Sequence, residues 1–163
     1  MTDVPVDFLP LLRRAGLLED GERPVFEALE GGVASDIWRV DLVRGPVCVK
    51  KALHKLKVAG DWRAPTSRNA YEARWLKTAA AIIPGAAPEV LAHDAGMFVM
   101  EYLDPGRFPC WKDLLLQGRA EQTFAAAVGE RLARIHSATA EDSEIAARFP
   151  ELMRNDDKPA FPA

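Results

Sequence analysis

The residue of this sequence that is best suited to take part in a reaction is a lysine at the end of a short apolar run. Lys50 follows Val47, Cys48 and Val49, a pattern that indicates a β-strand. Alternation along a strand puts Cys48 and Lys50 on one face and Lys51 on the other. A lysine on a rigid strand can hold phosphate oxygens in line, and positioning is most of what phosphoryl transfer requires of a protein. The alternative is that both lysines are solvated charges that close the strand.

Two further segments could line a nucleotide cleft. Gly31 and Gly32 lie between two predicted strands, and glycine allows the backbone to approach a phosphate closely. Such a glycine pair is also typical of a simple turn. Residues 99–103 (Val-Met-Glu-Tyr-Leu) predict a strand that ends at the cleft, or else a buried edge strand with aromatic packing.

The elements that must position these residues form an α+β series. Three strands, one helix and two more strands are predicted at residues 25–29, 37–42, 47–51, 68–83, 89–93 and 97–102. Thr66 or Ser67 is the predicted cap of the helix. A short amphipathic helix precedes the first strand, with Asp7 as its cap and Gly16 as its left-handed end, and we expect it to be an appendage.

Beyond residue 106 the pattern changes to helices. Residues 111–116 predict a short helix, and apolar residues at helical spacing then predict a longer one that ends near Ser137. The segment from Ala140 onward is polar and broken by prolines, so we expect a loose tail.

The order of these segments resembles the aminoglycoside phosphotransferase and choline-kinase-like family, whose fold is that of protein kinases. The resemblance spans about residues 25–140 and is carried by residues 29–40, Lys50, Glu72, residues 100–103 and residues 132–136. It implies a small lobe at residues 1–103, made of a five-stranded antiparallel sheet, one helix and the N-terminal helix. The hinge and the first helices of an incomplete large lobe follow at residues 104–140, and the loose polar tail is 141–163.

The resemblance also implies roles in binding ATP. Glu72 on the predicted helix pairs with Lys50 and fixes its ammonium against the α- and β-phosphates. The alternative for Glu72 is a surface pair with Arg68, four residues earlier. Gly31 and Gly32 supply the phosphate loop, and Ser35 or Asp36 lies where family members often carry a polar residue.

The predicted hinge would bind adenine through its main chain. The carbonyl of Glu101 and the amide of Leu103 face the edge of the base, Met100 lines the back of the pocket, and Cys48 lies beside the ring.

The catalytic and metal-binding residues of the family are not found in the sequence. Asp156 lies in an Asp-x-Lys-Pro pattern, but the residue five positions later is Phe161 where the family pattern requires asparagine. We therefore predict no catalytic or metal-binding residue, weak ATP binding in isolation, and magnesium only in a complete enzyme. A missing large lobe or a partner chain would complete it. The chain is interpreted as the nucleotide-binding half of a small-molecule phosphotransferase, whose acceptor the sequence does not name, or as a non-catalytic nucleotide-binding or protein-interaction module.

The composition of the chain limits the classes of protein to which it can belong. The chain has 163 residues, of which 48% are hydrophobic, enough for one globular domain with a core. A net charge of -3 gives no basic excess for nucleic acid or an anionic membrane surface. The sequence contains no apolar run of the ~20 residues that a membrane span needs. Its two cysteines form no disulfide framework, which indicates a cytoplasmic setting.

Overall fold

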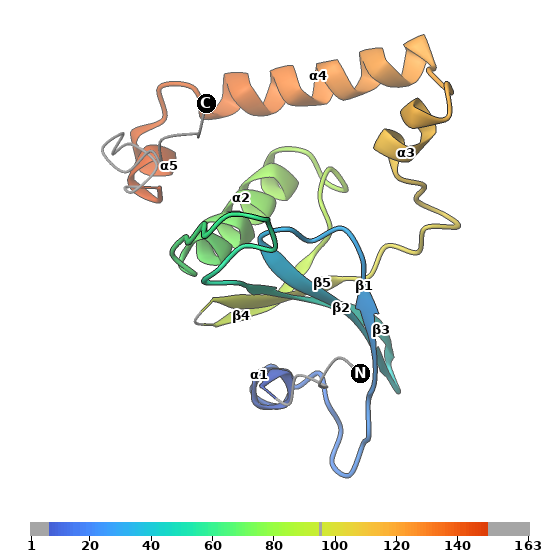
Figure 1. The fold of residues 1–163 in the computed structure, drawn as a ribbon. Helices are drawn as coiled ribbons and strands as arrows, with labels where there is room; N and C mark the ends of the chain where they lie inside the picture. Colours follow the sequence, from blue (N-terminus) through green and yellow to red (C-terminus); the bar gives the residue numbers. More distant parts are fainter. Residues whose placement is uncertain (1–6, 95, 150–163) are drawn as a thin grey trace. The chain divides into compact units, whose positions relative to one another are not determined.

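The computed structural model describes residues 7–94 and 96–149 (Figure 1). The chain divides into two compact units, Met1–Glu121 and Gln122–Ala163. The sheet and the candidate site residues belong to the first unit.

The first unit is built on a five-stranded antiparallel sheet with the order β1-β2-β3-β5-β4. The strands are β1 (Val25–Leu29), β2 (Ser35–Leu42), β3 (Gly45–Ala52), β4 (Val90–Asp94) and β5 (Met97–Glu101). The predicted α+β class and the five strands are confirmed. Strands β2 and β3 begin two residues earlier than predicted, at Ser35 and Gly45, because their hairpin register continues to the Leu42–Gly45 and Ser35–Ala52 pairs.

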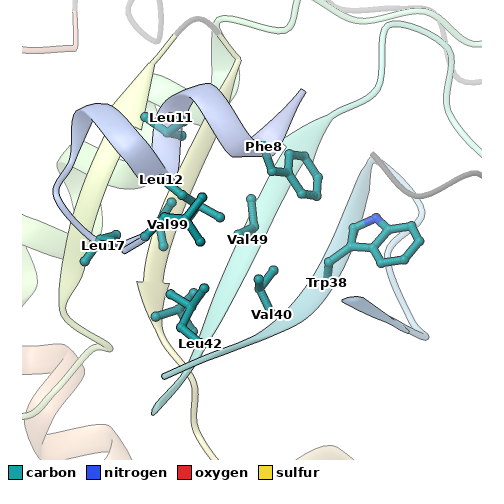
Figure 2. Packing of buried hydrophobic residues seen from close by; sticks show 11 residues of the cluster. Phe8, Leu11, Leu12, Leu17, Trp38, Val40, Leu42, Val49 and Val99 are labelled. Atoms are coloured by element: carbon teal, nitrogen blue, oxygen red, sulfur yellow. The ribbon is translucent and has the colours of Figure 1, made fainter. Parts of the chain in front are cut away.

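One face of the sheet is covered by α1 (Phe8–Arg14). Figure 2 shows Phe8 and Leu12 lying over Val49 and Val99, and all four are fully buried. The core cluster comprises Phe8, Leu11, Leu12, Leu17, Leu18, Trp38, Val40, Leu42, Val47, Val49 and Val99. The expectation that this helix is an appendage is therefore wrong. It supplies Phe8, Leu11 and Leu12 to the main core, because the alternating Val and Trp residues of β2, β3 and β5 need an apolar cover.

The ends of α1 only partly follow the predicted signals. Asp7 occupies the cap position but makes no side-chain cap hydrogen bond, so the predicted cap is wrong. Its Oδ2 atom instead accepts a hydrogen bond from Lys51 Nζ at 2.6 Å, which ties the start of α1 to β3. Gly16 follows the helix at φ +64°, the left-handed conformation that was predicted.

The other face of the sheet carries α2 (Arg68–Ile82), which lies on the opposite side from α1 (Figure 1). The helix ends one residue before the predicted position, at Ile82. Ser67 occupies the N-cap position without a cap hydrogen bond from its side chain, so this predicted cap is also wrong. Its backbone is already helical, with φ -56° and ψ -23°, whereas a capping serine is typically extended.

The remaining helices are α3 (Trp111–Leu116), α4 (Gln122–Thr139) and α5 (Ser143–Ala147). The helix α5 corrects the expectation of a loose tail from residue 140. Asp142 caps it by accepting hydrogen bonds from the amides of Glu144 and Ile145, at 2.9 Å each. Residues 150–163, which include Asp156 and the rest of the predicted tail, lie outside the described residues. Within the described part of the chain, no helix has the length and apolar character to span a membrane.

Candidate functional site

The centre of the candidate site is an ion pair between β3 and α2. Lys50 Nζ donates a hydrogen bond to Glu72 Oε1 at 2.5 Å. Lys51, the next residue, pairs with Asp7 across the sheet, so the two lysines point to opposite faces as strand alternation predicts. The Lys50 side chain is 19% exposed and that of Lys51 is 35% exposed. Lys50 is therefore not a solvated charge that closes the strand.

Arg68 does not compete for Glu72. Its guanidinium donates to the carbonyl oxygens of Ala34 and Leu53, the latter at 2.6 Å, and also to that of Pro65 at 2.7 Å. Arg68 thereby joins the start of α2 to the end of β3 and to the residue before β2. Because the guanidinium is engaged by main-chain oxygens, Glu72 is directed to Lys50.

The loop between β1 and β2 requires both of its glycines. Gly31 has φ +97°, a left-handed conformation that side chains disfavour. A Cβ atom on Gly32 would lie 2.2 Å from the carbonyl oxygen of Ser35, so any side chain there would force the loop to move. Ser35 itself is buried at the start of β2, whereas Gly31 is exposed. The exposed surface of the loop therefore includes Gly31 but not the side chain of Ser35.

The same loop is held by a segment that follows β3. The amide of Leu53 donates to the carbonyl of Ala34 at 3.0 Å, and the amide of Lys57 donates to that of Val33 at 2.9 Å. Lys57 Nζ also pairs with Asp36 at 2.8 Å. The glycine loop is thus fixed along its second half. The sequence pattern did not single out this segment, since its hydrogen bonds join residues about twenty positions apart.

Cys48 lies beside Lys50 on the α2 side of β3, between Arg39 of β2 and Met100 of β5 in the strand register. It is buried, and burial raises the pKa of its thiol from 9.0 to about 11, although the Lys50 ammonium acts in the opposite direction. The thiol is therefore protonated at neutral pH. It offers a small apolar surface rather than a nucleophile.

The predicted hinge continues from β5. Met100 is paired with Cys48 in the sheet, so the two side chains share one face. The amide of Glu101 donates to the carbonyl of Glu89 at 2.9 Å, which fixes the end of β5 against the residue before β4. Leu103 follows the strand and is exposed. The structure thus brings Lys50, Cys48 and Met100 onto one face.

Arg39 belongs to the same face and was not predicted. Its Nε atom donates to Asp41 Oδ1 at 2.9 Å, which raises the pKa of the guanidinium. The guanidinium carbon lies 5.0 Å from the centre of the Tyr102 ring, a cation–π contact. Alternation along β2 could have placed Arg39 beside Cys48, but nothing local predicts its contact with Tyr102.

A hollow of about 380 Å³ lies elsewhere in this unit, between the end of α2 and β4. Its lining includes Leu76, Ala80, Pro88, Glu89, Val90 and Glu101. Neither Lys50 nor Glu72 lines it, so the hollow is separate from the ion pair.

The chain matches no protein-family model and no curated protein. In the part of the chain that the structure describes, no group of three His, Cys, Asp or Glu residues is arranged to hold a metal ion. The candidate site is therefore defined by its own geometry: a lysine paired with a carboxylate, a glycine loop held through its main chain, and the side chains of Cys48 and Met100 on the same face of the sheet as the lysine.

Proposed function

We propose that this chain is the nucleotide-binding half of an ATP-dependent phosphotransferase that acts on a hydroxyl group of a small molecule. The observation that carries the proposal is the 2.5 Å pair between Lys50 of β3 and Glu72 of α2. In protein kinases a lysine of the third strand pairs with a glutamate of the following helix, and the pair positions the lysine on the phosphates of ATP.

The arrangement of elements supports the same proposal. The helix that supplies Glu72 lies between β3 and β4 in the chain, and the antiparallel sheet has the order β1-β2-β3-β5-β4. We propose that this unit is a kinase-like small lobe of the aminoglycoside phosphotransferase and choline-kinase-like type. Residues 100–103 would then form its hinge.

Each residue of the site has a defined task in this proposal. Lys50 binds the α- and β-phosphates, and Glu72 holds its ammonium in place. The loop at Gly31 and Gly32 offers main-chain amides to phosphate oxygens. Cys48 and Met100 provide the apolar wall for adenine.

ATP would supply the phosphoryl group, and magnesium would neutralise its developing charge. In this proposal the magnesium ligands belong to a large lobe or to a partner chain.

The neighbouring lysines provide a sharp test of this proposal. Calorimetric titration of ATP into the wild-type chain is expected to show weak binding that magnesium changes little. Lys50→Ala should weaken binding by about tenfold or more, because a charge-assisted contact to phosphate contributes roughly 1.5 to 3 kcal/mol. Lys51→Ala is the matched control: it removes the same charge from the opposite face and should leave the affinity unchanged.

Two results would contradict the proposal. Equal losses in the two variants would mean that general charge, rather than the Lys50 site, attracts the nucleotide. A wild-type chain that does not bind ATP at millimolar concentration would favour the protein-interaction module instead.

A further inference from the structure

The main chain of Lys50 is held by a second residue of α2. Asn69 is 1% exposed and precedes Glu72 by three positions. Its Nδ2 atom donates one hydrogen bond to the carbonyl of Lys50 at 3.2 Å and another to the carbonyl of Gly96 at 3.0 Å. The site assigned above uses the side chain of Lys50 and leaves Asn69 without a role.

Asn69 and Glu72 lie on the same side of α2, because residues three apart are neighbours on a helix surface. One helix face therefore contacts Lys50 twice. Asn69 binds its carbonyl, and Glu72 binds its ammonium 2.5 Å from the carboxylate. A slip of α2 along β3 would break both contacts together.

The direction of the Asn69 amide follows from its surroundings. Both neighbouring groups are carbonyl oxygens, so a flipped amide would bring Oδ1 against two acceptors. In the observed direction Oδ1 is buried and has no hydrogen-bond partner among the described residues. A buried polar atom without a partner is unfavourable, and the two donor contacts have to offset it.

The second acceptor extends this link to the turn between β4 and β5. Gly96 has φ +83°, and a Cβ atom there would lie 3.2 Å from Cβ of Thr66, just before α2. The carbonyl of Gly96 also accepts from the amide of Ala52 at 2.8 Å. Asn69 thus joins β3, the β4–β5 turn and α2 at one buried point.

We propose that Asn69 is the positioning residue for Lys50: it fixes α2 against β3 so that Glu72 meets the lysine ammonium. This inference rests on the proposed function, in which Lys50 binds the phosphates of a nucleotide. Asn69 does not touch the nucleotide. Asn69 acts through Lys50, so its replacement should weaken the binding of the phosphates and not the binding of the base.

The test compares Asn69→Ala with Thr78→Ala, a buried polar residue on the same helix. Asn69→Ala should weaken ATP binding about tenfold and leave adenosine binding unchanged, and Thr78→Ala should change neither. In a Lys50→Ala background, Asn69→Ala should cause no further loss, because the residue it positions is gone. The proposal is overturned if adenosine binding falls as much as ATP binding, or if the loss persists without Lys50.

A second measurement does not depend on nucleotide. The Nζ resonance of Lys50 in ¹⁵N-labelled protein, assigned with Lys50→Arg, should shift in Asn69→Ala and in Glu72→Gln but not in Thr78→Ala. An unshifted resonance in Asn69→Ala overturns the inference. If the wild-type chain binds no ATP but the resonance shifts as expected, the proposed function fails and the positioning role stands. Asn69→Ser, which keeps one donor, replaces the alanine variant in every comparison if the latter does not fold.

Discussion

Cys48 and Lys50 are two residues apart on one face of β3, and the surrounding structure affects them differently. Lys50 reaches the edge of α2 and forms an ion pair with the Glu72 carboxylate there. Cys48 has no such partner, and its burial favours the neutral thiol. A single strand face therefore combines a charged group with a small apolar side chain, to which the proposed function assigns the phosphates and the adenine of ATP.

The raised pKa of Cys48 predicts a loss of stability at alkaline pH. The thiol titrates at 9.0 in an ordinary environment and at about 11 in the folded chain. Above pH 9 the unfolded chain loses this proton first, so the free energy of unfolding should fall between pH 9 and 11. The thiol accounts for about 2 to 3 kcal/mol of this fall.

Urea denaturation across that pH range measures the effect. Cys48→Ala should flatten the profile by this amount, whereas Cys110→Ala, which alters an exposed cysteine, should not change it. Parallel profiles for wild type and Cys48→Ala would show that the thiol ionises as readily in the folded chain as in the unfolded chain.

At the residue scale, the sequence allowed part of the site to be predicted. Lys50 and Glu72 could be paired because a strand period and a helix period each place one charge at a defined position, and a known pattern connects them. Asn69 and Arg39 could not be predicted. Their partners are main-chain carbonyls and a ring from other elements, and no local pattern encodes such contacts.

At the scale of elements, α1 shows how local and tertiary signals differ. Its amphipathic spacing correctly predicts a helix, but the surface that it covers is formed by β2, β3 and β5, which are distant in the sequence. The role of α1 in the core was missed for this reason. The failed caps have a related cause: tertiary contacts hold the ends of α1 and α2, through Lys51 at Asp7 and through Arg68 at the carbonyls of Ala34 and Leu53.

The burial of α1 predicts a large effect of a small change. Leu12 is fully buried against the sheet, so Leu12→Ala should lower the free energy of unfolding by about 2 to 5 kcal/mol. Leu116→Ala is the control, because this leucine is 80% exposed on α3 and its loss should change stability by less than about 0.5 kcal/mol. Urea denaturation followed by tryptophan fluorescence measures both. Similar values for the two variants would mean that α1 does not belong to the core.

At the scale of the whole molecule, the core and the candidate site occupy opposite faces of one sheet. The α1 face is apolar and closed, and the α2 face carries Lys50, Glu72 and Arg39. The second unit differs from the first in how few apolar side chains it buries. Among its described residues only Ile135 and Phe149 are buried hydrophobics, and Phe124 and Leu132 of α4 are exposed.

This contrast predicts where the chain will be cut by a protease. Local opening is easiest where few apolar side chains are buried, so limited trypsin digestion should cleave first within Gln122–Ala163. The product that persists should begin before α1 and end near Glu121. It should therefore keep both Lys50 and Glu72, and mass spectrometry of the digest would identify it.

Lys51→Ala should not change the order of cleavage, whereas Leu12→Ala should expose the first unit at the same time as the second. Early cleavage of the wild-type chain between β1 and β5 would contradict this order and would mean that the sheet does not form the stable part of the molecule.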